Sequence, residues 1–100
     1  MKRIIAKRTL REFWEKHADS EQYLKTWYET VKNSNWKSPN EIKGTYVNAS
    51  SLKNNRVVFN IKGNSYRLIV RFNYVKQWAF IRFIGTHVEY DKIEGHYLKY

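Results

Sequence analysis

The chain has 100 residues, a length that accommodates one domain with one hydrophobic core, so we expect residues 1–100 to form a single domain. Nineteen Lys and Arg residues oppose nine Asp and Glu residues, which gives a formal net charge of +10. The sequence has no cysteine, which argues against a disulfide-dependent secreted domain and favours a cytoplasmic location. No segment has the length and apolar character of a signal peptide or a membrane span, so no membrane association is expected.

The first half of the chain is predicted to be mainly helical. A short strand at residues 3–6 precedes a helix that Thr9 is expected to cap, because Thr9 and Glu12 have the spacing of a capping box. Apolar residues then recur at helical spacing. Two further helices are predicted, one from Asp19 or Ser20 to residues 33–35, and a short one that starts at residues 38–41 with a cap, a first-turn proline and an acid.

From about residue 56 the spacing of the apolar residues changes from the helical period to alternation. We predict strands near residues 56–62, 65–74 and 77–86, with turns at Gly63-Asn64 and at residues 75–77. A short strand, then helices, then an antiparallel meander indicate an α+β domain in which two to three helices pack on one face of the sheet.

Successive side chains of a strand point to opposite faces of a sheet, so each predicted strand contributes two sets of residues. The apolar set is expected to pack under the helices and consists of Val57, Phe59 and Ile61, then Tyr66, Leu68, Val70, Phe72 and Tyr74, then Ala79, Ile81 and Phe83. The second set consists of Arg56, Val58, Asn60 and Lys62, then Arg67, Ile69, Arg71 and Asn73, then Trp78, Phe80, Arg82 and Ile84.

The second set defines what we name the open face, which is expected to carry five cations and two exposed aromatic rings. No Asp or Glu occurs between residues 42 and 88, so no acid neutralises these cations. Cations bind phosphates and rings stack on bases, which favours RNA as the partner. The alternative is a basic face that serves solubility, with the two rings under a C-terminal tail. The predicted RNA-binding residues are Arg56, Asn60, Arg71, Trp78, Phe80 and Arg82.

His87 follows the last predicted strand, and Tyr90 comes three residues later. This spacing puts both on one side of a turn or short helix, at the rim of the open face. Histidine is the side chain best suited to move protons near neutral pH, although a surface or capping role for His87 stays open. The sequence lacks Cys/His clusters with zinc spacing, and the sheet half lacks acids for magnesium, so no metal or other cofactor is predicted.

The chain resembles the HigB family of toxins from bacterial type II toxin–antitoxin pairs over roughly residues 2–93. The segments that carry the resemblance are RIIAKRTLREFWEKH, NNRVVFNIKGNSYRLIVRFNY and IRFIGTHVEYDKI. The resemblance implies a RelE-like fold and a metal-independent endoribonuclease that cuts mRNA, typically on the translating ribosome. It also implies a cognate HigA antitoxin with a helix-turn-helix domain. Without the resemblance, a non-catalytic RNA- or ribosome-binding module explains the charge equally well.

The resemblance also implies roles for individual residues. By position, Arg67 matches a strand arginine that contacts the scissile phosphate, and Asn60 and Lys62 fall where related enzymes place strand lysines. His87 falls near a late basic residue, and Tyr90 near a C-terminal tyrosine. The candidate catalytic residues are therefore Lys62, Arg67, His87 and Tyr90, and which of Lys62, His87 and Tyr90 acts as base and which as acid stays open.

Overall fold

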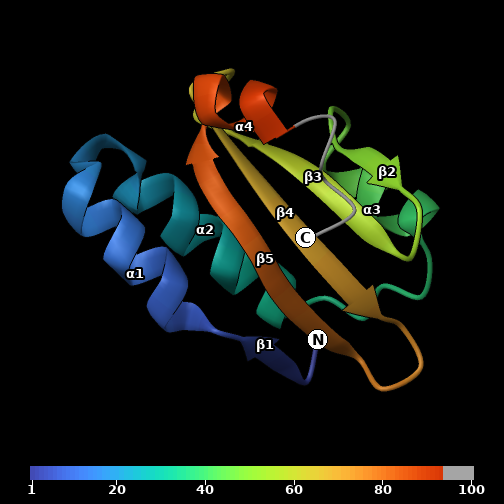
Figure 1. Cartoon of the computed structure of the whole chain (residues 1–100). Helices are drawn as coiled ribbons and strands as arrows, with labels where there is room; N and C mark the ends of the chain where they lie inside the picture. Colours follow the sequence, from blue (N-terminus) through green and yellow to red (C-terminus); the bar gives the residue numbers. More distant parts are fainter. Residues whose placement is uncertain (94–100) are drawn as a thin grey trace.

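The fold is built on one mixed sheet of five strands in the order β1-β5-β4-β3-β2 (Figure 1). The structure is a computed structural model and describes residues 1–93. The strands are β1 (Arg3–Ile5), β2 (Ser50–Leu52), β3 (Arg56–Ile61), β4 (Tyr66–Asn73) and β5 (Trp78–Thr86). The helices are α1 (Lys7–Lys16), the 3₁₀ turn η1 (Ala18–Ser20), α2 (Glu21–Lys32), α3 (Pro39–Thr45) and α4 (His87–Ile93).

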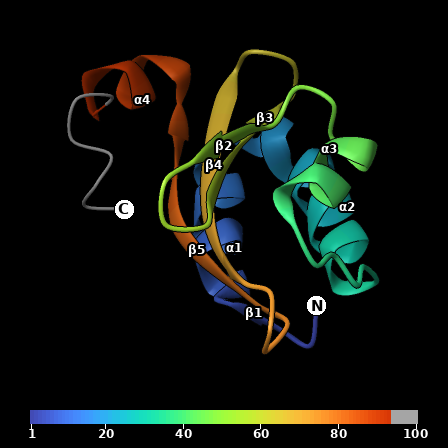
Figure 2. The same ribbon diagram turned by 90° about the vertical axis from the view of Figure 1, so that its right-hand side faces the viewer.

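Helices α1, α2 and α3 lie on one side of the sheet, and α4 projects to the other side from the end of β5 (Figure 2). The core lies between the sheet and the first three helices. From the helices it takes Leu10, Trp14, Leu24, Trp27, Val31 and Ile42, and from the sheet Val57, Phe59, Leu68, Val70, Phe72 and Ala79. The predicted α+β architecture, with its helices on one face, is confirmed.

A plain meander would be antiparallel throughout, whereas this sheet also contains one parallel pair. Strand β1 pairs with β5 in parallel, with Arg3 opposite Trp78 and Ile5 opposite Phe80. The other edge of β5 is occupied by β4, so β1 completes the sheet at its free edge before the chain turns into α1. The three-residue strand β2, which was not predicted, extends the opposite edge along β3.

A β-bulge in β5 shifts its alternation by one residue. Ile69 pairs with Phe83 but the next residue of β4 pairs with Ile81, so Arg82 is an extra residue on β5. Cross-strand partners share a face, so Phe83 lies with Ile69 on the open face. Ile84 lies opposite Leu68 and packs against the core. The predicted faces of Phe83 and Ile84 were therefore wrong, because alternation assumes a strand without bulges.

The predicted start of the first helix was also wrong. Helix α1 begins at Lys7, its N-cap is Ala6, and no side chain of residues 1–93 caps it. The Thr9 backbone N–H donates to the Ala6 carbonyl at 3.1 Å, so Thr9 already lies inside the first turn. The start of α3 is as predicted, with Ser38 at the N-cap and proline in the first turn.

Candidate active site

Arg67 lies on the open face near the start of β4. Its cross-strand partners are Asn60 on β3 and Gly85 on β5. Its guanidinium Nη1 donates to the carbonyls of Asn64 at 3.1 Å and Tyr66 at 3.3 Å. Both acceptors are uncharged, so these bonds orient the guanidinium and leave its positive charge available to a phosphate.

The residue of β5 that pairs with Arg67 is Gly85, which has no side chain. A Cβ atom there would lie 2.6 Å from a ring carbon of Phe83 and 3.2 Å from Oε1 of Glu89. Glycine at this position therefore lets the Phe83 ring and the Glu89 carboxylate come close to the β5 backbone at the residue that pairs with Arg67.

His87 is the first residue of α4, and its side chain is exposed. Its backbone N–H donates to the Ser65 carbonyl at 3.1 Å, which ties the start of α4 to the turn before Arg67. A hollow of about 510 Å³ lies at this junction, lined by His87 and by Asn64, Ser65, Tyr66, Thr86 and Val88. Tyr90, which is partly buried, follows one helical turn later on the same side of α4.

A capping box that the sequence analysis missed holds the start of α4. The Thr86 N–H donates to Oε1 of Glu89 at 2.8 Å, and the Glu89 N–H donates to Oγ1 of Thr86 at 3.1 Å. The bond from the Thr86 backbone is the main reason that the pKa of Glu89 lies below its ordinary value. The signal was present as a threonine followed three residues later by a glutamate.

Alternation predicted that Lys62 lies on the open face with Arg67, but the structure places it elsewhere. It follows β3 with a φ of +52°, and Gly63 follows with a φ of +60°, so the strand geometry has ended. The Lys62 Nζ atom lies 2.7 Å from Oδ2 of Asp19 in η1, and the Tyr66 hydroxyl donates to Oδ1 of the same carboxylate. Lys62 is thus directed toward η1, on the helical side of the molecule.

These contacts shift the pKa values of Asp19, Lys62 and Tyr66. The bonds from Lys62 and then from Tyr66 lower the pKa of Asp19 below its ordinary value. The Asp19 carboxylate raises the pKa of Lys62, and it also raises the pKa of Tyr66. Lys62 is therefore a cation at neutral pH, which makes it a poor proton acceptor as long as the pair is intact.

The expectation that Arg56 is exposed was wrong. It is only 2% exposed, and its Nε donates to the Lys53 carbonyl at 2.8 Å, so the guanidinium turns back onto the β2–β3 turn. Val58 and Ile69, predicted for the same face, are buried as well. The open face accordingly has fewer exposed cations than the five that were predicted. Arg71 and Arg82 are exposed on this face.

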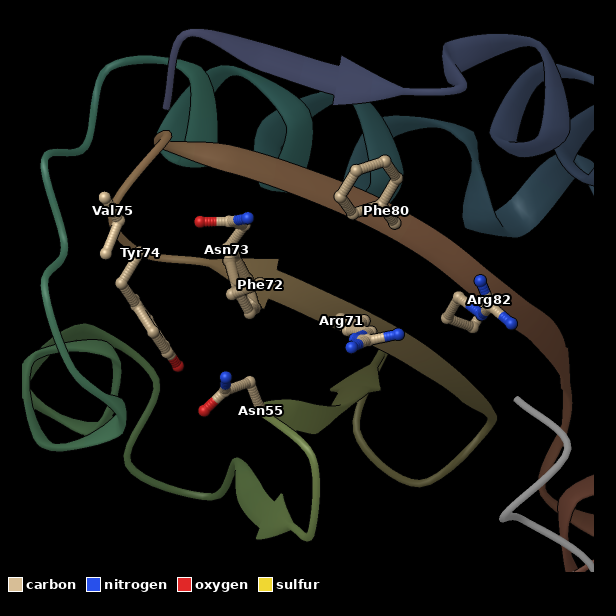
Figure 3. A pocket seen from close by; sticks show the side chains of 8 residues that line it. All are labelled: Asn55, Arg71, Phe72, Asn73, Tyr74, Val75, Phe80 and Arg82. Carbon is tan, nitrogen blue, oxygen red and sulfur yellow. The ribbon is translucent and has the colours of Figure 1, made fainter.

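A second hollow, of about 440 Å³, lies on the open face toward the β4–β5 turn. Figure 3 shows Arg71 and Arg82 on neighbouring strands at one end of it, and Phe80 and Asn73 farther along. Its remaining lining residues are Asn55, Phe72, Tyr74 and Val75. The structure thus brings two predicted RNA-binding arginines and one predicted stacking ring to a common hollow.

Trp78 lies beside this hollow and already has cationic neighbours. Its ring centroid is 6.0 Å from that of Phe80, and the Arg3 guanidinium and the Lys76 ammonium lie 5.3 and 5.0 Å from the indole. The sequence analysis did not connect Arg3 with Trp78, because only the parallel pairing of β1 with β5 brings them together. The C-terminal tail, which the alternative interpretation places over these rings, lies outside the described residues.

The described residues offer neither a metal cluster nor a membrane-spanning helix. Within residues 1–93 no group of three or more His, Asp and Glu side chains could hold a metal ion. Over the same range, no helix has the length and apolar character needed to span a bilayer. The chemistry present at the open face is cationic charge, an imidazole, a phenol and aromatic rings.

Comparison with known proteins agrees with this chemistry. Residues 20–93 match the family of HigB toxins, described as the RelE-like toxic component of a toxin–antitoxin system. The mRNA interferase HigB of Escherichia coli O6:H1 is 29% identical over 96 residues, 94% of this chain and 93% of the relative. The mRNA interferase toxin HigB of Escherichia coli K12 is 27% identical over 90 residues, 88% and 86% of the two chains. Since the family match covers well over half of the sequence, the chain belongs to the HigB toxin family.

Proposed function

We propose that this protein is the toxin of a type II toxin–antitoxin pair and an endoribonuclease that cleaves mRNA on the translating ribosome. The observation that carries the proposal is family membership combined with an oriented arginine, Arg67, and an exposed histidine, His87, which are both hydrogen-bonded to carbonyls of the β3–β4 turn. The relatives named above are mRNA interferases, which supports the same reaction for this chain.

The proposed reaction needs no metal: the 2′-hydroxyl of the RNA attacks the adjacent phosphate and expels the 5′-oxygen. The enzyme must align the hydroxyl, remove its proton, neutralise charge on the phosphate and protonate the leaving oxygen. Arg67 neutralises the phosphate, because its planar fork makes bidentate contacts that a lysine cannot make. His87 is the general base that removes the proton of the 2′-hydroxyl or the general acid that protonates the leaving 5′-oxygen. Tyr90 orients the nucleotide or carries the other of these two proton transfers.

Two further parts of the proposal concern RNA binding and Lys62. Arg71, Arg82 and Phe80 hold the RNA away from the scissile bond, at the hollow near the β4–β5 turn, with Trp78 beside it. Asn60 contacts the RNA at the other end of the strands, next to its cross-strand partner Arg67. Lys62 contributes through its charge and its bond to Asp19, since its raised pKa disfavours a role as base.

The proposed partners follow from the same family. A toxic component of a toxin–antitoxin system implies an antitoxin, which we propose to be a HigA protein with a helix-turn-helix domain. We propose that the whole chain forms a single toxin domain and acts in the cytoplasm, where mRNA and ribosomes are found.

The experiment that tests the proposal compares His87→Ala with the wild-type chain in a translation extract, with cleavage mapped from the 5′ ends of the mRNA. We expect the variant to fold but to lose cleavage, since a positioned acid–base group contributes roughly 10²- to 10⁴-fold. Lys16→Ala, on the exposed side of α1, is the control that should cleave normally. Cleavage by His87→Ala at the wild-type rate would refute its role.

The same assay distinguishes a nuclease from a non-catalytic RNA-binding module. Such a module would stall translation without new 5′ ends, whereas a nuclease degrades mRNA and arrests growth on expression. Arg67→Ala should then relieve both effects, because it removes the cation closest to the proposed scissile phosphate.

A further inference from the structure

Asp19 joins the helical layer to the turn between β3 and β4. Its carboxylate accepts hydrogen bonds from Nζ of Lys62, 43 positions later in the chain, and from the hydroxyl of Tyr66, 47 positions later. Two other ion pairs, Arg8–Glu12 and Lys25–Glu21, only connect residues one helical turn apart. The Asp19 contacts are therefore of a different kind, because they fix one element relative to another.

The turn that Asp19 contacts has a conformation that needs support. Lys62 and Gly63 both have left-handed φ angles, and for a residue with a Cβ atom this conformation is unfavourable. Such residues persist where their surroundings hold them, and they are often found at functional sites. Here the Lys62 side chain is held by Asp19, and its carbonyl accepts the Ser65 N–H at 3.1 Å.

The same turn positions both principal catalytic candidates. The Asn64 carbonyl accepts from the Arg67 guanidinium, and the Ser65 carbonyl accepts from the His87 backbone N–H. A shift of residues 62–65 would therefore move the phosphate-binding arginine and the start of α4 together.

We infer that Asp19 is a positioning residue for the active site: it anchors the β3–β4 turn and, through that turn, sets the placement of Arg67 and His87. The inference rests on the proposed nuclease function. The pair is half exposed, with the Asp19 and Lys62 side chains 48% and 39% exposed, so its contribution to global stability is small. Its effect is on local geometry, to which catalysis is far more sensitive than folding.

The first test is kinetic and uses Asp19→Ala beside Glu21→Ala. Glu21 is a matched control, because it is an acid two residues away whose ion pair with Lys25 stays within α2. We expect kcat for RNA cleavage to fall about 10- to 100-fold in Asp19→Ala, with KM nearly unchanged, and to stay at the wild-type value in Glu21→Ala. Should Asp19→Ala fail to fold, Asp19→Asn, which keeps an acceptor for Tyr66, is expected to show a smaller loss of the same kind.

A double variant identifies the route of the effect. Tyr66→Phe removes only the hydroxyl that donates to Asp19, and like Asp19→Ala it should lower kcat. The variant that combines Tyr66→Phe with Asp19→Ala should be no slower than Asp19→Ala alone, because both changes remove one shared contact. Additive losses would mean that the two residues act separately and would overturn the inference.

The second test does not depend on activity. Hydrogen exchange of the His87 amide reports its bond to the Ser65 carbonyl, and we expect faster exchange in Asp19→Ala but not in Glu21→Ala. Unchanged exchange would overturn the inference, as would an unchanged kcat in Asp19→Ala when the wild-type protein cleaves RNA. If the wild-type protein cleaves no RNA, the proposed function fails, and the exchange measurement alone decides whether Asp19 anchors the turn.

Discussion

At the scale of single residues, Arg67 and Arg71 provide a matched comparison, since they lie on the same strand and the same face. We expect Arg67→Ala to lower kcat under saturating substrate by about 10²-fold or more, because Arg67 meets charge that builds in the transition state. Arg71→Ala should weaken binding and change kcat much less. Single-turnover rates for the two variants check this. Equal losses of kcat would place the scissile bond between the two arginines rather than beside Arg67.

The pKa values of Asp19 and Glu89 predict how stability changes with pH. Both are lowered in the folded protein, so each carboxylate stabilises the fold above its ordinary pKa, 3.8 for Asp19 and 4.5 for Glu89. This contribution is lost as the pH falls through the ordinary pKa toward the lower folded value. We therefore expect the free energy of unfolding, measured by urea titration, to decrease below about pH 4.5. Combining Asp19→Asn with Glu89→Gln should flatten that decrease, and an equally steep decrease would contradict the prediction.

Residue positions could be predicted from the sequence only where strand geometry continues. Alternation placed Arg67, Arg71 and Phe80 on the open face, where the structure has them. It misplaced Lys62, because left-handed backbone at the strand end redirects the side chain. It could not foresee that Arg56 turns back onto a neighbouring turn. The contacts of Asp19 carry no local signal, since its partners lie more than 40 positions away.

At the scale of elements, α4 depends on its cap. It has seven residues, too few to be stable as a separate helix, and none of its described side chains is buried. We expect Thr86→Ala to reduce the local stability of α4 by about 1 kcal/mol and to lower cleavage, because His87 and Tyr90 are both on this helix. Amide exchange across α4 measures the first effect. Thr26→Ala, an exposed threonine on α2, is the control, and equal exchange in both variants would contradict the prediction.

The elements that were predicted correctly are those whose residues alone define them. Amphipathic stripes gave α2, and alternation gave β3 and β4, because burial on one face imposes a period on the sequence. The parallel pairing of β1 depends on β5, a strand distant in sequence, so no local pattern indicates it. Strand β2 and the bulge at Arg82 lie next to their partner strands, but a three-residue strand and a single extra residue leave no recognisable period in the sequence. The capping box at Thr9 failed because α1 begins one turn earlier, without a side-chain cap.

At the scale of the whole molecule, the net charge of +10 predicts that RNA binding depends steeply on salt, because bound cations release counterions from the RNA. The logarithm of affinity should fall linearly with the logarithm of salt concentration, and Arg71→Ala should reduce the slope by about one. Lys32→Ala, at the end of α2 on the opposite side of the sheet, should leave the slope for a short RNA unchanged. A slope that falls equally in both variants would mean that binding follows total charge and not the open face.

The pairing of β1 with β5 also affects when the protein becomes active during its own synthesis. Residues 3–5 find their partner strand only when residues 78–80 have been added. The proposed catalytic groups, from Arg67 to Tyr90, likewise come from the last third of the chain. Helices α1, α2 and α3 are therefore made before strands β2 to β5, which they cover. A ribosome that translates this chain has consequently passed the codon for Tyr90 before the product is able to cut mRNA.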